Sequence, residues 1–350
     1  MSAESAPARP ARRGHVVAAF DKFRASATAR DLDDVVVRLA RTRSLACDPV
    51  PVSDGGEGFA ASFAGEIVTA PTRGALGEPL LAPLTLVPTP EGVVAVIETA
   101  DVVGRDRLAH PSPADALAAS SDGVGLLILA AVQLGVSGVL VGCGGTSTSD
   151  AGLGCYRILS EAGGLPVPVT VATDVRATFL GARRFARQKG VRDDDLSLID
   201  ERLAAARLLY QRERGVDVEA LERTGAAGGI AGALGALGAR LVSGFDEVAR
   251  AQHLDERLAG AALVVTGEGR LDAGSLDGKV VWGVAEHADT ESALLVVCGT
   301  VDESAAAALR ARFANLTVVS LEERWPGRGV RDTLACVEAE VASALDDLGG

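Results

Sequence analysis

The strongest constraint on the fold is the regular alternation of two kinds of segment in the last third of the chain. Short runs of Val, Leu and Ala alternate there with segments whose apolar residues recur at helical spacing. Strands buried on both faces are continuous apolar runs, and a helix usually connects one parallel strand to the next. The pattern therefore predicts parallel strands at 262–269, 293–301 and 316–323, with helices at 279–288, 302–314 and 332–348.

The first sixty or so residues carry the same pattern. We expect a buried strand at 15–21 and an amphipathic helix at 26–43, followed by a strand that enters a glycine-rich turn. Neither end of the chain alone supplies enough parallel strands for a doubly wound sheet, whereas the two ends together do. We therefore predict a discontinuous Rossmann-like parallel-sheet domain formed by residues 14–65 and 260–350, preceded by a disordered segment at 1–13.

Residues 66–259 are predicted to form a second, mixed α/β domain inserted into the first. Segments at 66–100 are β-rich and their connections are short, which favours antiparallel strands. The part that follows is largely helical. It is expected to contain helices at 113–135, 150–164 and 193–215, strands at 137–145 and 167–175, and a glycine turn opening a tightly packed helix at 224–239. The fold class is thus α/β with two domains, and the cleft between them is the expected ligand site.

Charge and cysteine content exclude several functional classes. The formal net charge of −13 and the pI of about 4.9 argue against a nucleic-acid or anionic-membrane partner, which requires a basic surface. The five scattered cysteines contain no C-x-x-C pair, so a zinc site or a disulfide framework is not expected. A polar first dozen residues is not a signal peptide, and we expect a cytoplasmic protein.

Several common catalytic motifs are absent from the sequence. The string nearest to a P-loop has Ala273 in place of its first glycine and Val280 after its lysine. The chain has no G-x-G-x-x-G after a strand, no H-E-x-x-H and no G-x-S-x-G. A P-loop nucleotidase, a dinucleotide enzyme, a zinc peptidase and a serine hydrolase are therefore unsupported.

Loops rich in glycine, hydroxyl groups and carboxylates follow the predicted strands instead. The segment GGTSTSDAG, residues 144–152, lies between an apolar strand and a helix, where main-chain N–H groups and hydroxyls suit a phosphate group. A tight turn whose Ser, Thr or Asp caps the next helix explains it equally well. The loop DGGEG at 54–58 and the turn GAAGG at 225–229 are similar in composition, although glycines that serve packing alone would explain the second one.

Acidic and basic residues at strand ends complete the set of candidates. Glu268, Arg270 and Asp272 alternate directly after a buried strand, where ligands of open α/β sheets bind. They could hold Mg²⁺, bind a carboxylate substrate or form a surface salt bridge. Asp174 also ends an apolar strand, and Lys189 precedes a glycine. Lys279 begins a helix, where a cation is electrostatically disfavoured, so a functional reason for it is expected.

Taken together, these motifs resemble the glycerate kinase family of the first, bacterial type. The resemblance runs from about residue 15 to about residue 345 and keeps the family's order. It is carried by DKFRAS, DGGEG, ETADVVGRDRL, GGTSTSDAG, TDV, QKG, GAAGG, GEGRLD and LDGK. It implies transfer of a phosphoryl group from ATP to a hydroxyl group of glycerate with the help of Mg²⁺. It also implies two α/β domains that close over the site.

The sequence departs from the family pattern at positions that the resemblance places on the substrate side. Lys22 and Arg24 stand where the family has serine and lysine, and Asp277 stands where it has histidine. Val175 and Arg176 replace an Asn-Pro pair. Motifs on the phosphate side match the family pattern more closely. We therefore expect the kinase chemistry to be retained more readily than the preference for glycerate.

The resemblance and the strand-end positions together suggest residue roles. The expected catalytic residues are Asp174 as the base, Lys189 and Arg270 as the cations that neutralise phosphate or hold the substrate carboxylate, and Asp272. The expected nucleotide-binding residues are Asp54, Gly55, Gly56, Gly144, Gly145, Thr146, Ser147, Gly225, Gly228, Gly229 and Lys279. Glu57 and Glu268 are the candidate Mg²⁺ ligands, and roles within the acidic set, including Asp54 and Asp272, could be exchanged.

Two alternatives remain open from the sequence. The chain could be a kinase of a different small hydroxy-acid or polyol in specialised metabolism, or a nucleotide- or ligand-binding homologue without turnover. A dehydrogenase is a distant further possibility, because the glycine fingerprint is missing. The sequence leaves open which hydroxyl group is phosphorylated and whether the protein is a monomer or a homodimer.

Overall fold

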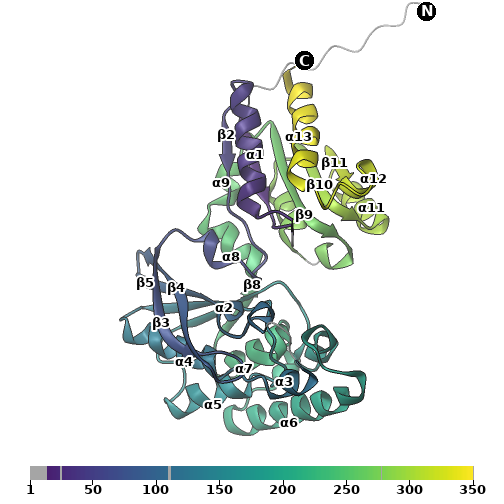
Figure 1. Ribbon diagram of the computed structural model, residues 1–350. Coiled ribbons are helices and arrows are strands. Elements are labelled where there is room, and N and C mark those ends of the chain that lie inside the picture. The colour runs from purple at the N-terminus through teal and green to yellow at the C-terminus, as the bar shows by residue number, and fades with distance from the viewer. Residues whose placement is uncertain (1–13, 24–25, 109–111, 277, 350) are drawn as a thin grey trace, which may run out of the picture. The chain divides into compact units, whose positions relative to one another are not determined.

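The computed structural model describes residues 14–23, 26–108, 112–276 and 278–349 (Figure 1). The chain divides into two compact units: unit 1 comprises Met1–Val52 and Gln252–Gly350, and unit 2 comprises Ser53–Ala251. The N-terminal segment for which we expected disorder lies outside the described residues. The α/β fold class is confirmed, because each unit contains one sheet flanked by helices.

Unit 1 contains a five-stranded sheet in the order β11-β10-β9-β1-β2, and all of its strand pairs are parallel. Its strands are β1 (Val16–Phe20), β2 (Cys47–Pro49), β9 (Leu263–Leu271), β10 (Ala293–Val301) and β11 (Leu316–Ser320). Its helices are α1 (Ala29–Thr42), α9 (Leu254–Leu258), α10 (Val280–His287), α11 (Glu303–Arg312), α12 (Leu321–Arg324) and α13 (Thr333–Gly349). The central pairing of β1 with β9 joins the two ends of the chain in one sheet.

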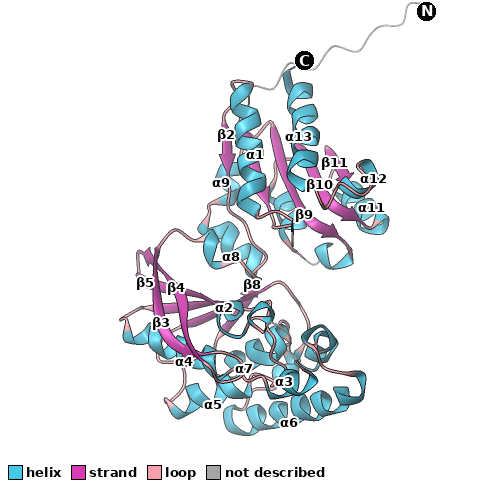
Figure 2. Cartoon of the chain, viewed as in Figure 1, coloured by secondary structure: helices cyan, strands magenta, loops and turns pink. Residues whose placement is uncertain are grey.

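Helix α1 shows how the sequence builds unit 1. Its N-terminus is closed by a capping box, in which Thr28 and Asp31 accept hydrogen bonds from each other's main-chain N–H groups, each 3.1 Å long. Leu32, Val36 and neighbouring apolar residues form the buried stripe of the helix. The stripe packs with α13 on one face of the sheet, where the two helices lie side by side (Figure 2).

Unit 2 contains a six-stranded mixed sheet in the order β3-β4-β5-β6-β7-β8. Its strands are β3 (Glu66–Arg73), β4 (Pro79–Thr89), β5 (Gly92–Glu98), β6 (Gly138–Gly142), β7 (Val169–Thr173) and β8 (Arg240–Ser243). The first three are antiparallel, as their short connections predicted, and the strands from β5 to β8 are parallel. The carboxyl ends of four strands therefore point to the same edge of this sheet.

The helices of unit 2 cover its sheet unevenly. They are α2 (Thr99–Val103), α3 (Pro113–Ala118), α4 (Asp122–Gln133), α5 (Leu153–Glu161), α6 (Leu196–Arg214), α7 (Ile230–Ala236) and α8 (Gly244–Ala251). The larger core lies on the face covered by α2, α4, α5 and α7. The opposite face carries a small apolar cluster of Phe59, Val96, Leu140, Ala172 and Val248.

Several elements on either side of the boundary between unit 2 and the second part of unit 1 differ from the prediction. The glycine turn and the helix after it are present, but β8, α8 and α9 were not expected from the sequence. Strand β8 is only four residues long and pairs with β7 alone, so it lacks the long apolar run of a central strand.

The boundaries between the units also differ from those predicted at 65 and 260. Residues 53–65 belong to unit 2, because the main-chain N–H groups of Gly58 and Ala60 donate to the Glu98 carboxylate, at 2.9 and 2.7 Å. Residues 252–259 belong to unit 1, because Arg257 forms an ion pair with Asp48 and its carbonyl lies 2.8 Å from the His15 ring nitrogen. Such long-range contacts leave no local signal in the sequence.

Two further sequence expectations can be compared with the described residues. No helix among them is long and apolar enough to pass through a membrane. All five cysteines are described and carry free thiols, four of them buried. Burial raises the pKa of the half-buried Cys47 to about 12, so this thiol is a weak nucleophile.

Candidate functional site

The candidate residues of unit 2 gather at the carboxyl ends of β6, β7 and β8. Here the segment after Ser53 lies directly against the strand ends. A Cβ atom added to Gly55 would lie 2.9 Å from Gly244 Cα and 3.1 Å from Thr173 N, and one added to Gly144 would lie 2.7 Å from Gly56 Cα. Only glycine permits these approaches, and Gly55 also has a φ of +95°. The predicted loops at 54–58 and 144–152 therefore belong to one site.

The loop at 54–58 is folded around two carboxylates. Asp54 is buried and accepts a 3.1 Å hydrogen bond from the Gly56 N–H group. The Glu98 side chain at the end of β5 is buried as well, and it accepts the hydrogen bonds that place this loop in unit 2. Glu57 between them is exposed. We did not select Glu98 from the sequence, although an acid that ends an apolar strand was the same signal that led to Asp174.

The hydroxyl groups of the loop at 144–152 point into the protein. Ser147 donates a 2.9 Å hydrogen bond from Oγ to the Val103 carbonyl, and Thr146 Oγ1 accepts a 3.0 Å hydrogen bond from Lys189 Nζ. Both side chains are buried. These hydrogen bonds hold the loop in shape, and the predicted contact of Thr146 and Ser147 with the nucleotide stays a prediction. The glycines Gly144 and Gly145 are the parts of the loop that can approach a phosphate through their main chain.

Lys189 holds this loop in place through hydrogen bonds. Its side chain is only 6% exposed. Its ammonium group donates to Thr146 Oγ1 and, at 2.7 Å, to the Thr148 carbonyl. Burial lowers the pKa of Lys189 to about 7, and the charge of Asp150 acts in the opposite direction. Lys189 thus positions the loop, and its predicted role in neutralising phosphate or holding the substrate carboxylate stays a prediction.

The glycine turn at 225–229 packs against the same lysine. Ala227, Gly228 and Gly229 all have positive φ, with values of 52°, 69° and 98°. A Cβ atom on Gly228 would lie 2.1 Å from the Thr148 carbonyl oxygen and 2.9 Å from Lys189 Nζ. The turn and Lys189 are thus in contact, and the predicted role of the turn in binding the nucleotide stays a prediction.

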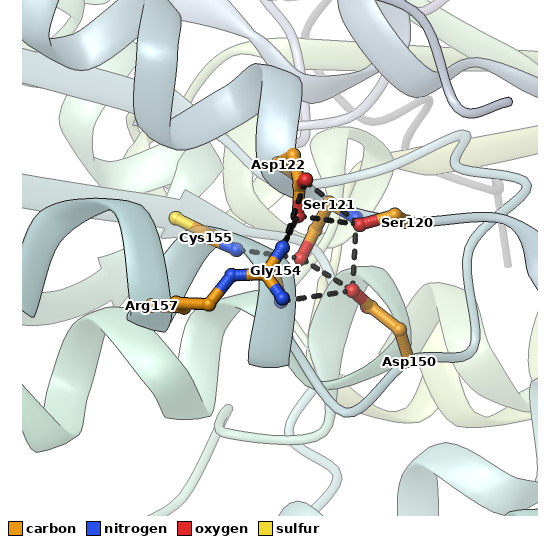
Figure 3. Close-up of polar contacts among 7 residues, drawn as sticks. All are labelled: Ser120, Ser121, Asp122, Asp150, Gly154, Cys155 and Arg157. Atoms are coloured by element: carbon orange, nitrogen blue, oxygen red, sulfur yellow. Dashed lines mark hydrogen bonds and ion pairs between the residues drawn. The ribbon is translucent and has the colours of Figure 1, made fainter. Parts of the chain in front are cut away.

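Asp150 anchors the end of the loop (Figure 3). One carboxylate oxygen accepts hydrogen bonds from the N–H and Oγ–H groups of Ser121, at 2.8 and 2.7 Å, and from Gly154 N at 3.1 Å. The other accepts from Gly152 N at 3.1 Å. Ser121 Oγ in turn accepts a 3.0 Å bond from Cys155 N. Asp150 therefore ties together the first turns of α4 and α5, as the capping interpretation of this loop proposed.

At the end of β7, Asp174 lies beside an arginine that we did not predict. Asp174 is half-buried, and the half-buried Arg223 donates a 3.2 Å hydrogen bond from Nη1 to the Thr173 carbonyl. Burial is the main cause that lowers the pKa of Arg223, while the charge of Asp174 is among those that raise it. Arg223 has a φ of +74°, which is uncommon for a residue other than glycine and cannot be read from the sequence.

The other predicted residues lie in unit 1, in the second half of β9 and in the segment between β9 and α10. Glu268 is buried near the end of β9, next to Cys298 of β10 in the sheet register. Arg270 and Asp272 are largely solvent-exposed, at 74% and 45%, and their charged atoms lie 3.6 Å apart. Asp272 Oδ1 also accepts a 2.9 Å hydrogen bond from the Gly274 N–H group, and the predicted roles of the pair in binding Mg²⁺ or a carboxylate substrate stay predictions. Lys279 is half-buried and immediately precedes α10.

The predicted set therefore forms two groups, one on each unit. Unit 2 carries the glycine loops, Asp54, Glu57, Asp174 and Lys189, and unit 1 carries Glu268, Arg270, Asp272 and Lys279. Within the described parts of the chain, no three His, Cys, Asp or Glu side chains are grouped so that they could hold a metal ion on their own. Arg24 and Asp277, two of the departures from the family pattern, lie outside the described residues.

A cavity of about 240 Å³ lies elsewhere in unit 1, between the end of α10 and residues 312–315. It is lined by Leu294 and Asn315, at the amino ends of β10 and β11. Asn315 Nδ2 already donates to the Thr290 carbonyl at 2.9 Å. Because ligands of open parallel sheets bind at the carboxyl ends of strands, we do not assign the reaction to this cavity.

Comparisons with known proteins find similarity along nearly the whole chain. A family model described as the glycerate kinase family matches residues 16–162 and 165–339. An uncharacterized protein of Mycobacterium bovis is 39% identical over 254 residues, which span 68% of this chain. The matched part covers 65% of that relative, slightly less than two thirds of its length.

Relatives with names that state an activity are similar over more of their length. The glycerate 2-kinase of Escherichia coli is 30% identical over 345 residues, covering 85% of this chain and 88% of the relative. The glycerate kinase of Bacillus subtilis is 31% identical, covering 78% and 81%. A solved structure of a candidate glycerate kinase 2 from Salmonella typhimurium has a TM-score of 0.75 at 27% identity and covers 96% of this chain and 98% of that one.

Proposed function

Because this chain belongs to the glycerate kinase family, we propose that it transfers the terminal phosphoryl group of ATP to a hydroxyl group of glycerate. The observation that carries the proposal is the family match from residue 16 to residue 339, which includes every motif of the two strand-end groups. Neither a polyol substrate nor a binding role without turnover is favoured by any of these relatives. The name of the E. coli relative leads us to expect 2-phosphoglycerate as the product.

The glycine loops of unit 2 are proposed to hold the phosphate groups of ATP. Phosphoryl transfer depends mainly on positioning and on electrostatic stabilisation of the transferring group. The segment Gly144–Gly145 and the turn at 225–229 present main chain that is fixed by Lys189 and Asp150 before a ligand arrives. The predicted residues Asp54, Gly55 and Gly56 pack against the same segment and complete this part of the site.

Asp174 is proposed as the base that accepts the proton of the substrate hydroxyl group. It directly follows β7, so the strand fixes its main chain, and its carboxylate is half-buried beside Arg223. A positioned base raises a rate by about 10²–10⁴-fold when it lies within hydrogen-bond reach of the proton. Arg270 and Asp272 of unit 1 keep their proposed catalytic assignment, since an exposed pair can exchange its salt bridge for a ligand at little cost.

Glu57 and Glu268 remain the proposed Mg²⁺ ligands. Mg²⁺ bound to a nucleotide takes only one or two protein carboxylates, and phosphate oxygens and water supply the rest. Glu57 fits this requirement, because it is exposed and close enough to Asp101 that its charge raises the pKa of Asp101, although burial is the larger cause. When bound, the ion would neutralise negative charge on the phosphates. Lys279 before α10 in unit 1 stays a candidate nucleotide-binding residue.

The proposed partners are glycerate and ATP alone, in the cytoplasm. The five free cysteines are consistent with a reducing compartment. Both a monomer and a homodimer remain compatible with the proposal.

The direct test is ATP consumption by the purified protein with Mg²⁺ and D-glycerate, beside a panel of small hydroxy-acids and polyols. Turnover with D-glycerate at about 1–10³ s⁻¹ is the expected result, with the phosphorylated position read from the product by NMR. Turnover with another compound only, or ATP binding without any turnover, would contradict the proposal.

A further inference from the structure

We propose that Arg223 binds the carboxylate group of the substrate and thereby makes the enzyme select hydroxy-acids over neutral polyols. The inference rests on the proposed function, because it assigns the specificity of that same site. Arg223 belongs to no motif that the family resemblance contains, and its position beside Asp174 emerges only from the structure.

The backbone around Arg223 is fixed on both sides. Its N–H group donates to the Arg176 carbonyl at 3.4 Å, and the Gly225 N–H group donates to the Ala177 carbonyl at 3.0 Å. A Cβ atom added to Gly225 would lie 2.3 Å from the Thr178 carbonyl oxygen, so the two segments touch. The left-handed conformation of Arg223 is thus held by its surroundings, and strain of this kind is concentrated at functional sites.

The guanidinium group lies at the carboxyl ends of two neighbouring parallel strands. Its Nη1 atom donates to the carbonyl of Thr173, the last residue of β7. The charge of Asp246, in the first turn of the helix that follows β8, also acts on it. This is the edge at which open α/β sheets bind their ligands.

Among the described residues, the guanidinium group of Arg223 has no direct carboxylate partner. In the described part of the chain, no carboxylate oxygen lies within 4.0 Å of its guanidinium in an ion pair, and its hydrogen bond goes to a neutral carbonyl. Burial is the main cause that lowers the pKa of Arg223, and the more distant charges of Asp246, Glu222 and Asp174 act in the opposite direction. Burying a cation without a direct ion pair is costly, and a bound carboxylate would relieve that cost.

The geometry of a hydroxy-acid fits this arrangement. Arginine presents a planar fork of donors that pairs with both oxygens of a carboxylate, and Nη1 uses only part of that fork on Thr173. In glycerate the 2-hydroxyl group is on the carbon next to the carboxylate. A carboxylate held by Arg223 therefore places that hydroxyl group near Asp174, the next residue after Thr173, which is the proposed base.

Arg183 provides a control outside the proposed site. It forms an ion pair with Asp200 at 2.8 Å, and both side chains are about half exposed, at 48% and 49%. Its cation is therefore already paired, and replacing it should change little in the free energy of substrate binding.

The test compares wild type with Arg223→Gln, Arg223→Lys and Arg183→Gln, using D-glycerate and its uncharged amide as substrates. For Arg223→Gln we expect kcat/KM for D-glycerate to fall on the order of 10–100-fold, the size of one charged hydrogen-bonded contact. The KM for ATP and the kcat/KM for the amide should stay within about twofold, and Arg183→Gln should resemble wild type. Arg223→Lys should recover part of the loss, because lysine keeps the charge but not the fork.

Equal losses with both substrates, or no loss with D-glycerate, would overturn the proposal. Thermal unfolding of each variant shows whether it is folded, and Arg223→Lys keeps the test decisive if Arg223→Gln is not. Failure of the proposed function is recognised separately, because wild type itself would not phosphorylate D-glycerate. Calorimetric binding of D-glycerate then tests Arg223 alone: weaker binding by Arg223→Gln supports the assignment, and unchanged binding refutes it.

Discussion

In unit 2 the residues at the strand ends are buried and hydrogen-bonded to one another, whereas in unit 1 the corresponding pair of Arg270 and Asp272 lies mostly in solvent. Lys189 and Asp150 fix the loop at 144–152 through several hydrogen bonds each. Arg270 and Asp272 form an ion pair of 3.6 Å. The loop held by Lys189 and Asp150 is organised before any ligand binds, so substituting either residue should change stability. Arg270 can rearrange at small cost, so substituting it should change activity alone.

The largest effect should come from Asp174→Asn, which removes the proposed base and keeps its shape. We expect kcat to fall by about 10²–10⁴-fold with little change in the melting temperature. Steady-state kinetics with D-glycerate measure it. The exposed Asp246→Asn is the control for loss of a nearby negative charge and should keep kcat within about twofold. An unchanged kcat for Asp174→Asn would mean that another group is the base.

Asp150→Ala should show the cost of breaking the buried group. It leaves the Ser121 hydroxyl and the N–H groups of Gly152 and Gly154 without their acceptor, so we expect the free energy of unfolding to fall by about 2–4 kcal/mol. Urea unfolding followed by circular dichroism gives the value. Arg157→Ala, which breaks a partly exposed pair with Asp122, should cost less than about 1 kcal/mol. Equal losses of unfolding free energy in the two variants would contradict the expected difference between buried and exposed hydrogen-bonding partners.

Because of Lys189, the free energy of unfolding should increase as the pH rises. Its pKa is about 7 in the folded protein and near 10.4 when unfolded, so between these values the unfolded chain binds the extra proton. The free energy of unfolding should therefore rise as pH increases from about 7 to 10, by up to about 1.4 kcal/mol per pH unit. Below about pH 7 the lysine is charged in the folded protein, and the full cost of burying that charge lowers stability.

Urea unfolding at several pH values tests this against Lys189→Met, in which that rise should disappear. Arg187→Met on the same turn breaks only an exposed pair with Asp193 and should keep the slope of wild type. Parallel curves for wild type and Lys189→Met would show that the lysine remains protonated in the folded state.

The smallest change in stability should follow Arg270→Gln. Its exposed pair contributes less than about 1 kcal/mol, so the melting temperature should stay close to that of wild type. The proposed catalytic role predicts at the same time a loss of kcat/KM of about tenfold or more, from the removal of a cation that meets phosphate. A drop in stability with unchanged kinetics would make Arg270 a structural residue and remove the distinction between the two groups.

Much of the fold could be predicted because it depends on local patterns. The buried runs at β1, β9 and β10 and the antiparallel start of unit 2 follow from apolar periodicity and from the lengths of connections. The loops at 54–58 and 144–152 were recognised as site segments from their glycines, which the close approaches of Gly55 and Gly144 explain.

The direction of individual side chains could not be predicted. The sequence cannot reveal that Thr146 and Ser147 point inward, or that Lys189 is buried, because partners more than forty residues away decide both. Arg223 is a stronger example, since its left-handed main chain and its contact with Thr173 depend on the packing of two loops. The residues that were missed depend on contacts between segments far apart in the sequence, which composition does not reveal.

The pairing of β1 with β9 also affects how the protein is made. During synthesis β1 and β2 emerge first, but their partner strand begins only at Leu263, after all of unit 2. Ribosomes add about 5–20 residues per second, so these two strands wait for tens of seconds. Unit 2 is continuous in sequence and can fold during that interval, whereas unit 1 must keep its first apolar strands from aggregating until the end of the chain arrives.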